Sequence, residues 1–240
     1  EPAINPVPRR MIQASITEVT SGALKVTISI PGGRELAADT FNPRLGIVDG
    51  LSILGTSGRV RPFSHPALRS ALKCLLDVAV ATGVKAPVFV PGHIGEKAAR
   101  KHFRLTAEQV IEVSNEWGFM LDLAVKCNFG GLLALGHPGK LAKLAAGDWD
   151  THSSRSKSAV PFVANLASEV LGYRLSEFPT VEGLFSTLGQ TERKLLGDVL
   201  AQKIKCAVAD RVGMDLVVAT VLVNMQSELI GASGALELWR

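Results

Sequence analysis

The chain has 240 residues, 47% of them hydrophobic, and its 26 Lys and Arg against 22 Asp and Glu leave a formal charge of +4. Apolar content this high excludes a disordered chain, because such a chain can bury enough surface to offset the entropy of ordering. A charge of +4 without a run of Lys or Arg argues against a dedicated nucleic-acid surface. The length suits one large domain, or one domain with a smaller module.

Residues 15–30 are expected to form a β-hairpin. Ser15–Thr20 and Ala23–Ile30 alternate apolar and polar residues around Ser21-Gly22, which is the pattern of two strands joined by a tight turn. Pro31–Gly33 would end the second strand, and a short helix over 34–40 is expected to follow. Residues 1–46 are therefore interpreted as the hairpin segment of a smaller α+β domain.

Residues 47–240 have the pattern of an α/β domain, because short apolar runs end in glycine-rich turns and lead into amphipathic helices. This repetition is typical of a doubly wound, mostly parallel sheet with flanking helices. Strands are expected at 51–54, 87–90, 110–113, 132–135 and 216–223, the last pairing with 228–230. Helices are expected at 66–82, from residue 96 to about 103, and at 117–126, 141–146, 160–171, 181–188 and 191–212.

Neither a membrane span nor a cysteine-based site is predicted. The uncharged stretch from Cys127 to Gly139 contains glycines and a proline and is shorter than the ~18–20 apolar residues that a spanning helix needs. No signal-peptide pattern opens the chain. Cys74, Cys127 and Cys206 are too scattered for a disulfide framework or a metal site, so we expect buried, reduced thiols in a cytoplasmic protein.

Several glycines fall at the ends of the predicted strands. In doubly wound sheets, ligands bind outside the carboxyl ends of the strands, where the strand order reverses. Glycines also terminate strands and helices in general, so one such turn means little. Several on one sheet edge favour a ligand cleft. The glycines concerned are Gly55, Gly58, Gly92, Gly95, Gly136 and Gly139.

The common catalytic motifs are missing from these turns. The segment Gly136–Lys140 is not a phosphate loop, because Ala134 and Leu141 occupy positions that need glycine and Ser/Thr. Ser57 lacks the surroundings of a nucleophile elbow, and the histidines lack the i,i+4 spacing of a zinc pair. What remains is a cleft with a cationic rim, suited to a ligand that carries several carboxylates. Among the cations near it, Lys97 and Lys143 are expected to be ordinary solvated side chains.

Several phrases of the sequence resemble the cobalt-precorrin-5B (C-1)-methyltransferase family, CbiD. The resemblance covers roughly residues 1–160 and is weak beyond them. The phrases that carry it are Ala3–Arg9, Pro31–Gly33, Thr40–Ile47, Ser52–Gly58, Pro91–Glu96, Ser114–Leu121, Gly136–Lys143 and Thr151–Ser153. Asp49, Arg59 and Arg61 depart from the family's pattern. Family members carry a further N-terminal stretch, so the chain is interpreted as the C-terminal part of a longer protein.

The resemblance implies transfer of a methyl group from S-adenosylmethionine to C-1 of cobalt-precorrin-5B in anaerobic cobalamin synthesis, giving cobalt-precorrin-6A. It implies a corrinoid substrate, the N-terminal remainder as a partner and no resident metal, and it leaves homo-oligomerisation open. The expected donor contacts are Gly55, Thr56, Ser57, Gly58, Gly92, Gly95, Asn115 and Gly136. The expected corrinoid contacts are Arg44, His93, Lys140 and His152, and His137 is the candidate for proton handling.

Two other functions stay open at this point. One is a non-catalytic corrinoid-binding or scaffold protein of the same pathway. The other is a hydrolase or other small-molecule enzyme on the same α/β framework, since a fold alone does not determine chemistry. A Ser–His–acid geometry around Ser57 would favour the hydrolase.

Overall fold

The computed structural model describes residues 2–40, 42–55, 64–175, 177–213 and 216–240, with only the backbone of Arg44. The chain divides into two compact units, residues 1–74 and 75–240. Among the described residues, no helix combines the length and the apolarity needed to cross a membrane.

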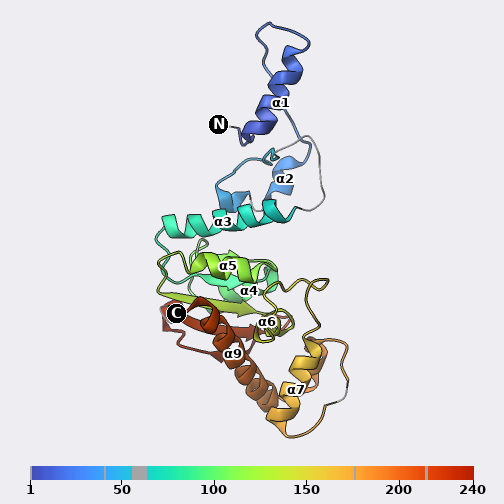
Figure 1. Cartoon of the computed structure of the whole chain (residues 1–240), viewed down its shortest axis with the longest axis vertical. Coiled ribbons are helices and arrows are strands. Elements are labelled where there is room, and N and C mark those ends of the chain that lie inside the picture. Colours follow the sequence, from blue (N-terminus) through green and yellow to red (C-terminus); the bar gives the residue numbers. More distant parts are fainter. Residues whose placement is uncertain (1, 41, 56–63, 176, 214–215) are drawn as a thin grey trace. The chain divides into compact units, whose positions relative to one another are not determined.

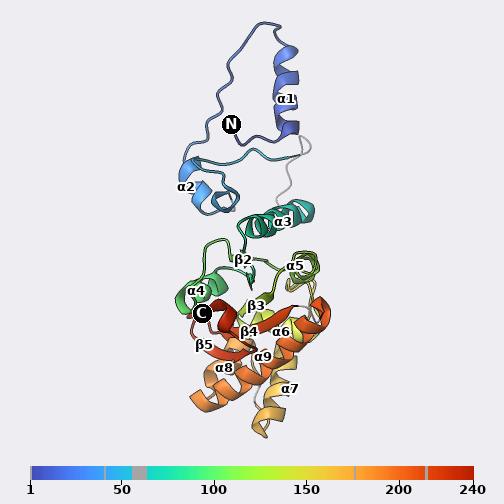
Figure 2. The ribbon, with the colours of Figure 1, turned by 90° about the vertical axis from the view of Figure 1, so that its left-hand side faces the viewer.

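The second unit is built on a five-stranded sheet with helices on both faces (Figures 1 and 2). The strand order is β2-β1-β3-β4-β5; the first four strands are parallel, and β5 pairs antiparallel with β4. The strands are β1 (Val88–Val90), β2 (Val110–Glu112), β3 (Gly131–Gly136), β4 (Val217–Val223) and β5 (Leu229–Ser233). The helices are α4 (His93–His102), α5 (Trp117–Ala124), α6 (Pro138–Ala145), α7 (Val160–Leu171), α8 (Val181–Thr187) and α9 (Gln190–Val212), and a 3-10 turn spans Glu237–Trp239.

The core explains why the central strands have continuous apolar sequences. Successive side chains of a strand point to opposite faces. Val88 and Val90 of β1 belong to the cluster that includes Ala98 of α4, whereas Phe89 meets the ring of Trp117 of α5 edge to face at 6.4 Å. Because helices cover both faces, every residue of β1 and β3 is buried.

The strand order reverses between β1 and β3, since the chain passes outward from β1 to β2 and then returns to the other side of β1. The carboxyl ends of β1, β2 and β3 therefore meet at one edge of the sheet. In open parallel sheets this reversal opens the crevice in which ligands bind. The doubly wound fold predicted from the glycine turns is confirmed.

The first unit contains α1 (Pro6–Thr17), α2 (Gly33–Ala38), a 3-10 turn at Pro43–Leu45 and the start of α3 (His65–Ala81), which continues into the second unit. The predicted strand at 51–54 is reduced to an isolated parallel bridge between Ile53 and Ile4. The predicted short helix before the 3-10 turn and the helix at 66–82 are present.

The predicted N-terminal hairpin is not formed by the described residues. Ser15–Thr17 are the last residues of α1, whose first turn carries prolines that suit the start of a helix. Residues 23–30 have the expected alternation but no strand partner in the described part of the chain, and a strand without a ladder is not a stable element. The prediction of buried cysteines is also wrong for Cys74 and Cys206, which are exposed.

Candidate functional site

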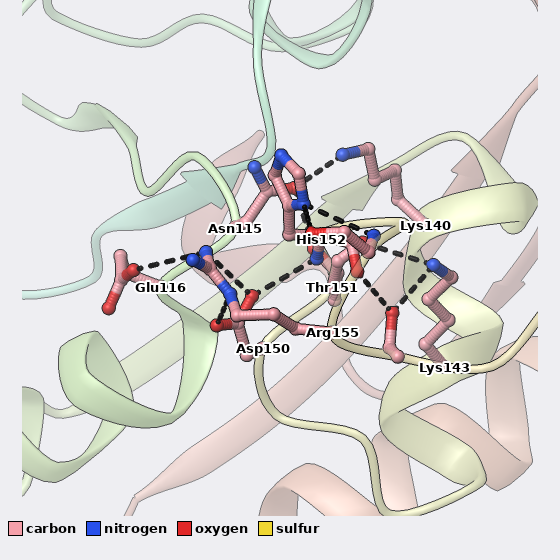
Figure 3. A network of polar contacts seen from close by, with 10 residues as sticks. Asn115, Glu116, Lys140, Lys143, Asp150, Thr151, His152 and Arg155 are labelled. Carbon is pink, nitrogen blue, oxygen red and sulfur yellow. Dashed lines mark hydrogen bonds and ion pairs between the residues drawn. The ribbon is translucent and has the colours of Figure 1, made fainter. Parts of the chain in front are cut away.

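A network of polar side chains lies where β2 and β3 end, and connects the loop after β2 with α6 and with the segment 150–156 (Figure 3). Its centre is Asn115. The Oδ1 atom of Asn115 accepts hydrogen bonds from Lys140 Nζ and from Thr151 Oγ1, the latter at 3.2 Å. The Asn115 carbonyl also accepts from the Thr151 backbone N–H at 3.1 Å. Three segments far apart in the sequence are thereby joined.

The backbone at this turn is strained. Ser114 has φ +54°, a left-handed conformation that is uncommon for residues with a side chain. Such residues cluster at functional sites, where the surrounding structure holds them in place. Here the conformation of Ser114 turns the chain sharply at the end of β2 and presents Asn115 to Lys140 and Thr151.

Lys140 is the half-buried cation of the network. Burial lowers the pKa of its ammonium below the ordinary value of 10.5, and the nearby charge of Lys143 lowers the pKa further, whereas Asp150 acts in the opposite direction. A cation in such surroundings gains from a nearby anion, because an opposite charge favours the protonated form. The position of Lys140 therefore suits a carboxylate of a bound ligand.

Lys143 is buried, with 7% of its surface exposed, so the prediction of a solvated side chain is wrong. Its Nζ donates to the Thr151 carbonyl at 3.1 Å and to Ser156 Oγ at 2.7 Å. Ser156 Oγ in turn donates to the His152 carbonyl at 2.8 Å. Lys143 thus anchors the loop that carries Thr151 and His152 against α6.

Both charge signs occur on that loop. Arg155 Nε lies 2.5 Å from Asp150 Oδ2, and its Nη2 lies 4.0 Å from Oε1 of the buried Glu116. The His152 backbone N–H donates to Asp150 Oδ1 at 3.1 Å, and His152 Nδ1 lies 2.8 Å from Ser154 Oγ. The carboxylate of Asp150 therefore orders the turn on which His152 stands.

His137 has both ring nitrogens engaged within the chain. Its Nδ1 accepts the Gly139 N–H at 3.0 Å, so His137 caps the N-terminus of α6. Its Nε2 lies 2.8 Å from Glu182 Oε2 of α8. Because Nδ1 accepts a hydrogen bond, the ring proton sits on Nε2 and is donated to Glu182. These contacts position α6 against α8; the predicted proton-handling role of His137 stays a prediction.

The predicted glycines have different surroundings. A Cβ on Gly95 would lie 2.9 Å from the Leu135 carbonyl oxygen, and one on Gly136 would lie 2.7 Å from Pro91 Cδ. These two glycines allow close packing of the chain on itself. Gly92, in contrast, stands at the end of β1, where a Cβ would be 3.7 Å from Glu112 Oε1. Gly92 thus exposes backbone beside a carboxylate.

The structure brings together only part of the predicted set. Asn115, Lys140 and His152 share the network, and Gly92 and the exposed His93 lie at the end of β1. Gly55 belongs to the first unit. Thr56, Ser57, Gly58 and the side chain of Arg44 lie outside the described residues. Because Ser57 is one of these residues, the structure does not test the hydrolase alternative.

Sequence reasoning missed several members of this site. Thr151 and Glu116 lie within the family phrases but were given no role, and Asp150 carries no motif of its own; all three are recognised only through their contacts. Glu112 had a usable signal, since it follows Gly92 by about 20 residues across one strand–helix–strand unit. That spacing is typical of an acidic residue that binds a nucleotide ribose.

The fold defines a doubly wound α/β protein, with a polar, partly cationic network at the edge of the sheet where the strand order reverses. Comparison with known proteins makes the class more specific. Residues 1–62 match the CbiD family, and residues 150–234 match the CbiD C-terminal domain. The chain belongs to the CbiD family. The likeness that was expected to be weak beyond residue 160 extends to residue 234.

Relatives match along nearly the whole chain. A protein of Syntrophotalea carbinolica named cobalt-precorrin-5B C(1)-methyltransferase is 54% identical over all of this chain and 69% of its own length. Proteins of the same name from Methanocaldococcus jannaschii and Alkaliphilus metalliredigens are 39% and 37% identical, over 97% and 96% of this chain and 66% and 63% of their own lengths. The chain thus spans about two thirds of these relatives. No solved structure matches it.

Proposed function

We propose that this chain acts in methyl transfer to C-1 of cobalt-precorrin-5B, giving cobalt-precorrin-6A, in anaerobic cobalamin biosynthesis. The observation that carries the proposal is the 54% identity, over all 240 residues, to a relative named for this reaction. The reversal of strand order between β1 and β3 supports it, because this is where doubly wound proteins bind small molecules.

The proposed methyl donor is S-adenosylmethionine, which supplies an electrophilic methyl group on a sulfonium when bound. The residues at the ends of β1 and β2 suit its adenosyl part. The Glu112 carboxylate can accept hydrogen bonds from ribose hydroxyls, and Gly92 permits close approach of the backbone beside it. Asn115 completes this side of the site after the strained turn at Ser114.

The corrinoid is proposed to bind on the side of Lys140 and His152. The macrocycle carries acetate and propionate groups, and carboxylates form short, strong hydrogen bonds with cations. Asn115 accepts from the Lys140 ammonium and is itself held by Thr151, so the ammonium is positioned before substrate arrives. His93, at the start of α4, is a further donor at the same sheet edge.

The role of the chain's own residues in this reaction is to bind and orient. Methyl transfer from a sulfonium is an in-line displacement, so alignment of donor and acceptor can supply much of the acceleration. The clamp of Lys143 on the segment 151–156 limits movement of the corrinoid side of the site. The His137–Glu182 pair positions α6, which carries both lysines.

Donor and acceptor binding are tested with separate variants. We expect Glu112→Gln to weaken binding of S-adenosylhomocysteine about tenfold by calorimetry, because a neutral amide is a weaker acceptor than a carboxylate. We expect Lys140→Ala to raise KM for cobalt-precorrin-5B about tenfold and to leave that donor affinity unchanged. Lys203→Ala, an exposed change on α9, is the control for both.

The proposal fails if the protein, supplied with the family's additional residues, binds no S-adenosylhomocysteine and transfers no labelled methyl group to the corrinoid. Corrinoid binding without donor binding would support the non-catalytic alternative. We also propose that the part of the relatives that this chain does not span acts together with it as the remainder of the enzyme.

A further inference from the structure

The segment Ala23–Ile30 of the first unit is extended and has no strand partner among the described residues. Its backbone N–H groups make no hydrogen bond within the described chain, and of its carbonyls only that of Ile30 accepts one, from the Gly33 N–H at 3.0 Å. A row of unpaired backbone donors and acceptors is a template for pairing with another strand.

The side chains of this segment are arranged for burial on one face. Leu24, Val26, Ile28 and Ile30 alternate with Lys25, Thr27 and Ser29, so the apolar side chains share one side of the extended chain. These four apolar side chains are 63%, 51%, 46% and 45% exposed, respectively. A run of this pattern with both its backbone and its apolar face uncovered is unusual in a protein that acts alone.

Two cavities of the first unit border the segment. Leu24, Val26 and Ile28 line one of about 690 Å³ together with Ile12 and Ile16 of α1, and α1 itself has no buried residue. Ile28 and Ile30 line the other, of about 850 Å³, with Val48 and Leu51 among its other walls. Each cavity is open and has apolar walls, so it can accept the apolar side chains of an added element.

We infer that Leu24–Ile30 and α1 form a docking surface for the additional third of the family's polypeptide, which adds a β-strand to this segment and places apolar side chains in the two cavities. Unpaired backbone over an extended run selects an extended peptide, because main-chain hydrogen bonds supply affinity and alternate side chains supply specificity. This inference deepens the proposal that the family's additional residues act with this chain.

The relatives contain additional residues that can occupy this surface. This chain spans 69%, 66% and 63% of three of them, so about a third of each relative's residues lies outside the matched region. The CbiD family match over residues 1–62 includes all residues of this surface. A second copy of this chain is the competing occupant, and it is distinguished below by its concentration dependence.

The test uses this chain and the unmatched third of the Syntrophotalea carbinolica relative, made as a separate polypeptide. We expect one-to-one binding by calorimetry, and amide hydrogen exchange at alternate residues of 24–30 slowed at least 100-fold on binding, because ladder formation protects the N–H groups that face the added strand. No donor or corrinoid is present, so failure here leaves the test of methyl transfer unaffected. Unchanged exchange at 24–30 would overturn the inference.

Matched variants locate the contact. Val26→Lys with Ile28→Lys places two charges on the apolar face, and we expect affinity to fall at least 100-fold. Thr27→Lys with Ser29→Lys adds the same charge to the opposite face and is expected to change affinity less than fivefold. Equal effects of the two pairs would contradict the proposed face.

Two further results would also overturn the inference. Protection of 24–30 in this chain alone, rising with protein concentration, would identify a second copy as the occupant. If the separate polypeptide does not fold, amide exchange is measured in the intact relative instead. There the segment matching Leu24–Ile30 must exchange slowly; rapid exchange would exclude the proposed strand pairing.

Discussion

The buried ammonium of Lys143 provides the sharpest test of how the site is held together. In Lys143→Met a side chain of similar length keeps the apolar stem and removes the charge. Thr151 O and Ser156 Oγ then lose the donor that binds them at 3.1 and 2.7 Å. The loop 151–156 should separate from α6, because no other residue in the described part of the chain donates a hydrogen bond to the Thr151 carbonyl.

The size of the effect follows from these two bonds. Hydrogen bonds that involve a charged group contribute about 1.5–3 kcal/mol each, or about 3–6 kcal/mol together. Part of this loss is offset, because the variant no longer buries an ammonium. We therefore expect the free energy of unfolding to fall by about 2–4 kcal/mol. For a protein of this size that lowers Tm by about 4–16 °C.

The assay is urea unfolding together with amide exchange over 150–158. Lys97→Met is the control, since Lys97 is an exposed lysine on α4. We expect faster exchange across the loop in Lys143→Met and unchanged exchange in the control. Equal stability of the two variants, with the loop equally protected in both, would refute the argument that Lys143 anchors this side of the site.

Three further changes test other parts of the second unit. Gly197→Ala places a Cβ 2.0 Å from the Ile230 carbonyl oxygen and should cost about 3 kcal/mol or more of unfolding free energy in urea titration. His137→Ala should cost about 1–2 kcal/mol in the same titration, because the cap of α6 is lost, and His137→Asn should restore most of it. Lys140→Met should remove a rise in stability at alkaline pH. Burial lowers the pKa of Lys140 in the folded protein below its ordinary value of 10.5, so between the folded and the unfolded pKa the unfolded chain holds more protons. The free energy of unfolding of the wild type therefore increases with pH in this range, relative to that of the variant.

Each of these has its own control or contrary result. Gly130→Ala is the control for Gly197→Ala, since the added Cβ would meet nothing closer than 3.9 Å. We expect it to leave the free energy of unfolding nearly unchanged. If methyl transfer is lost in His137→Asn although stability is restored, His137 handles a proton in addition to capping α6. A stability difference between wild type and Lys140→Met that stays constant up to pH 10.5 would contradict the buried position of that ammonium.

The elements of the second unit could be predicted from local sequence because their signals are local. Apolar runs bounded by glycine predicted β1 and β3, and helical periodicity predicted α7 and α9. Such patterns depend on whether one or both faces of an element are buried, and not on which element covers them. The parallel sheet followed from their alternation.

The N-terminal part of the first unit could not be predicted in this way. Alternation over Ala23–Ile30 is a genuine strand signal, but a strand exists only with a partner that supplies its hydrogen bonds. No described residue supplies one, so the segment stays extended and unpaired. The same alternation, together with its exposure, is what points to an added strand.

The sequence by itself determined the glycine turns, the strand–helix alternation and the family, because each depends on neighbouring residues or on likeness along the chain. Only the tertiary structure decided what each polar residue does. Lys140 and Lys143 are three residues apart on α6, yet Lys140 is half-buried with Asn115 and Lys143 is enclosed by Thr151 and Ser156. Their partners lie on loops whose positions depend on how the whole sheet packs. No local sequence pattern predicts those positions.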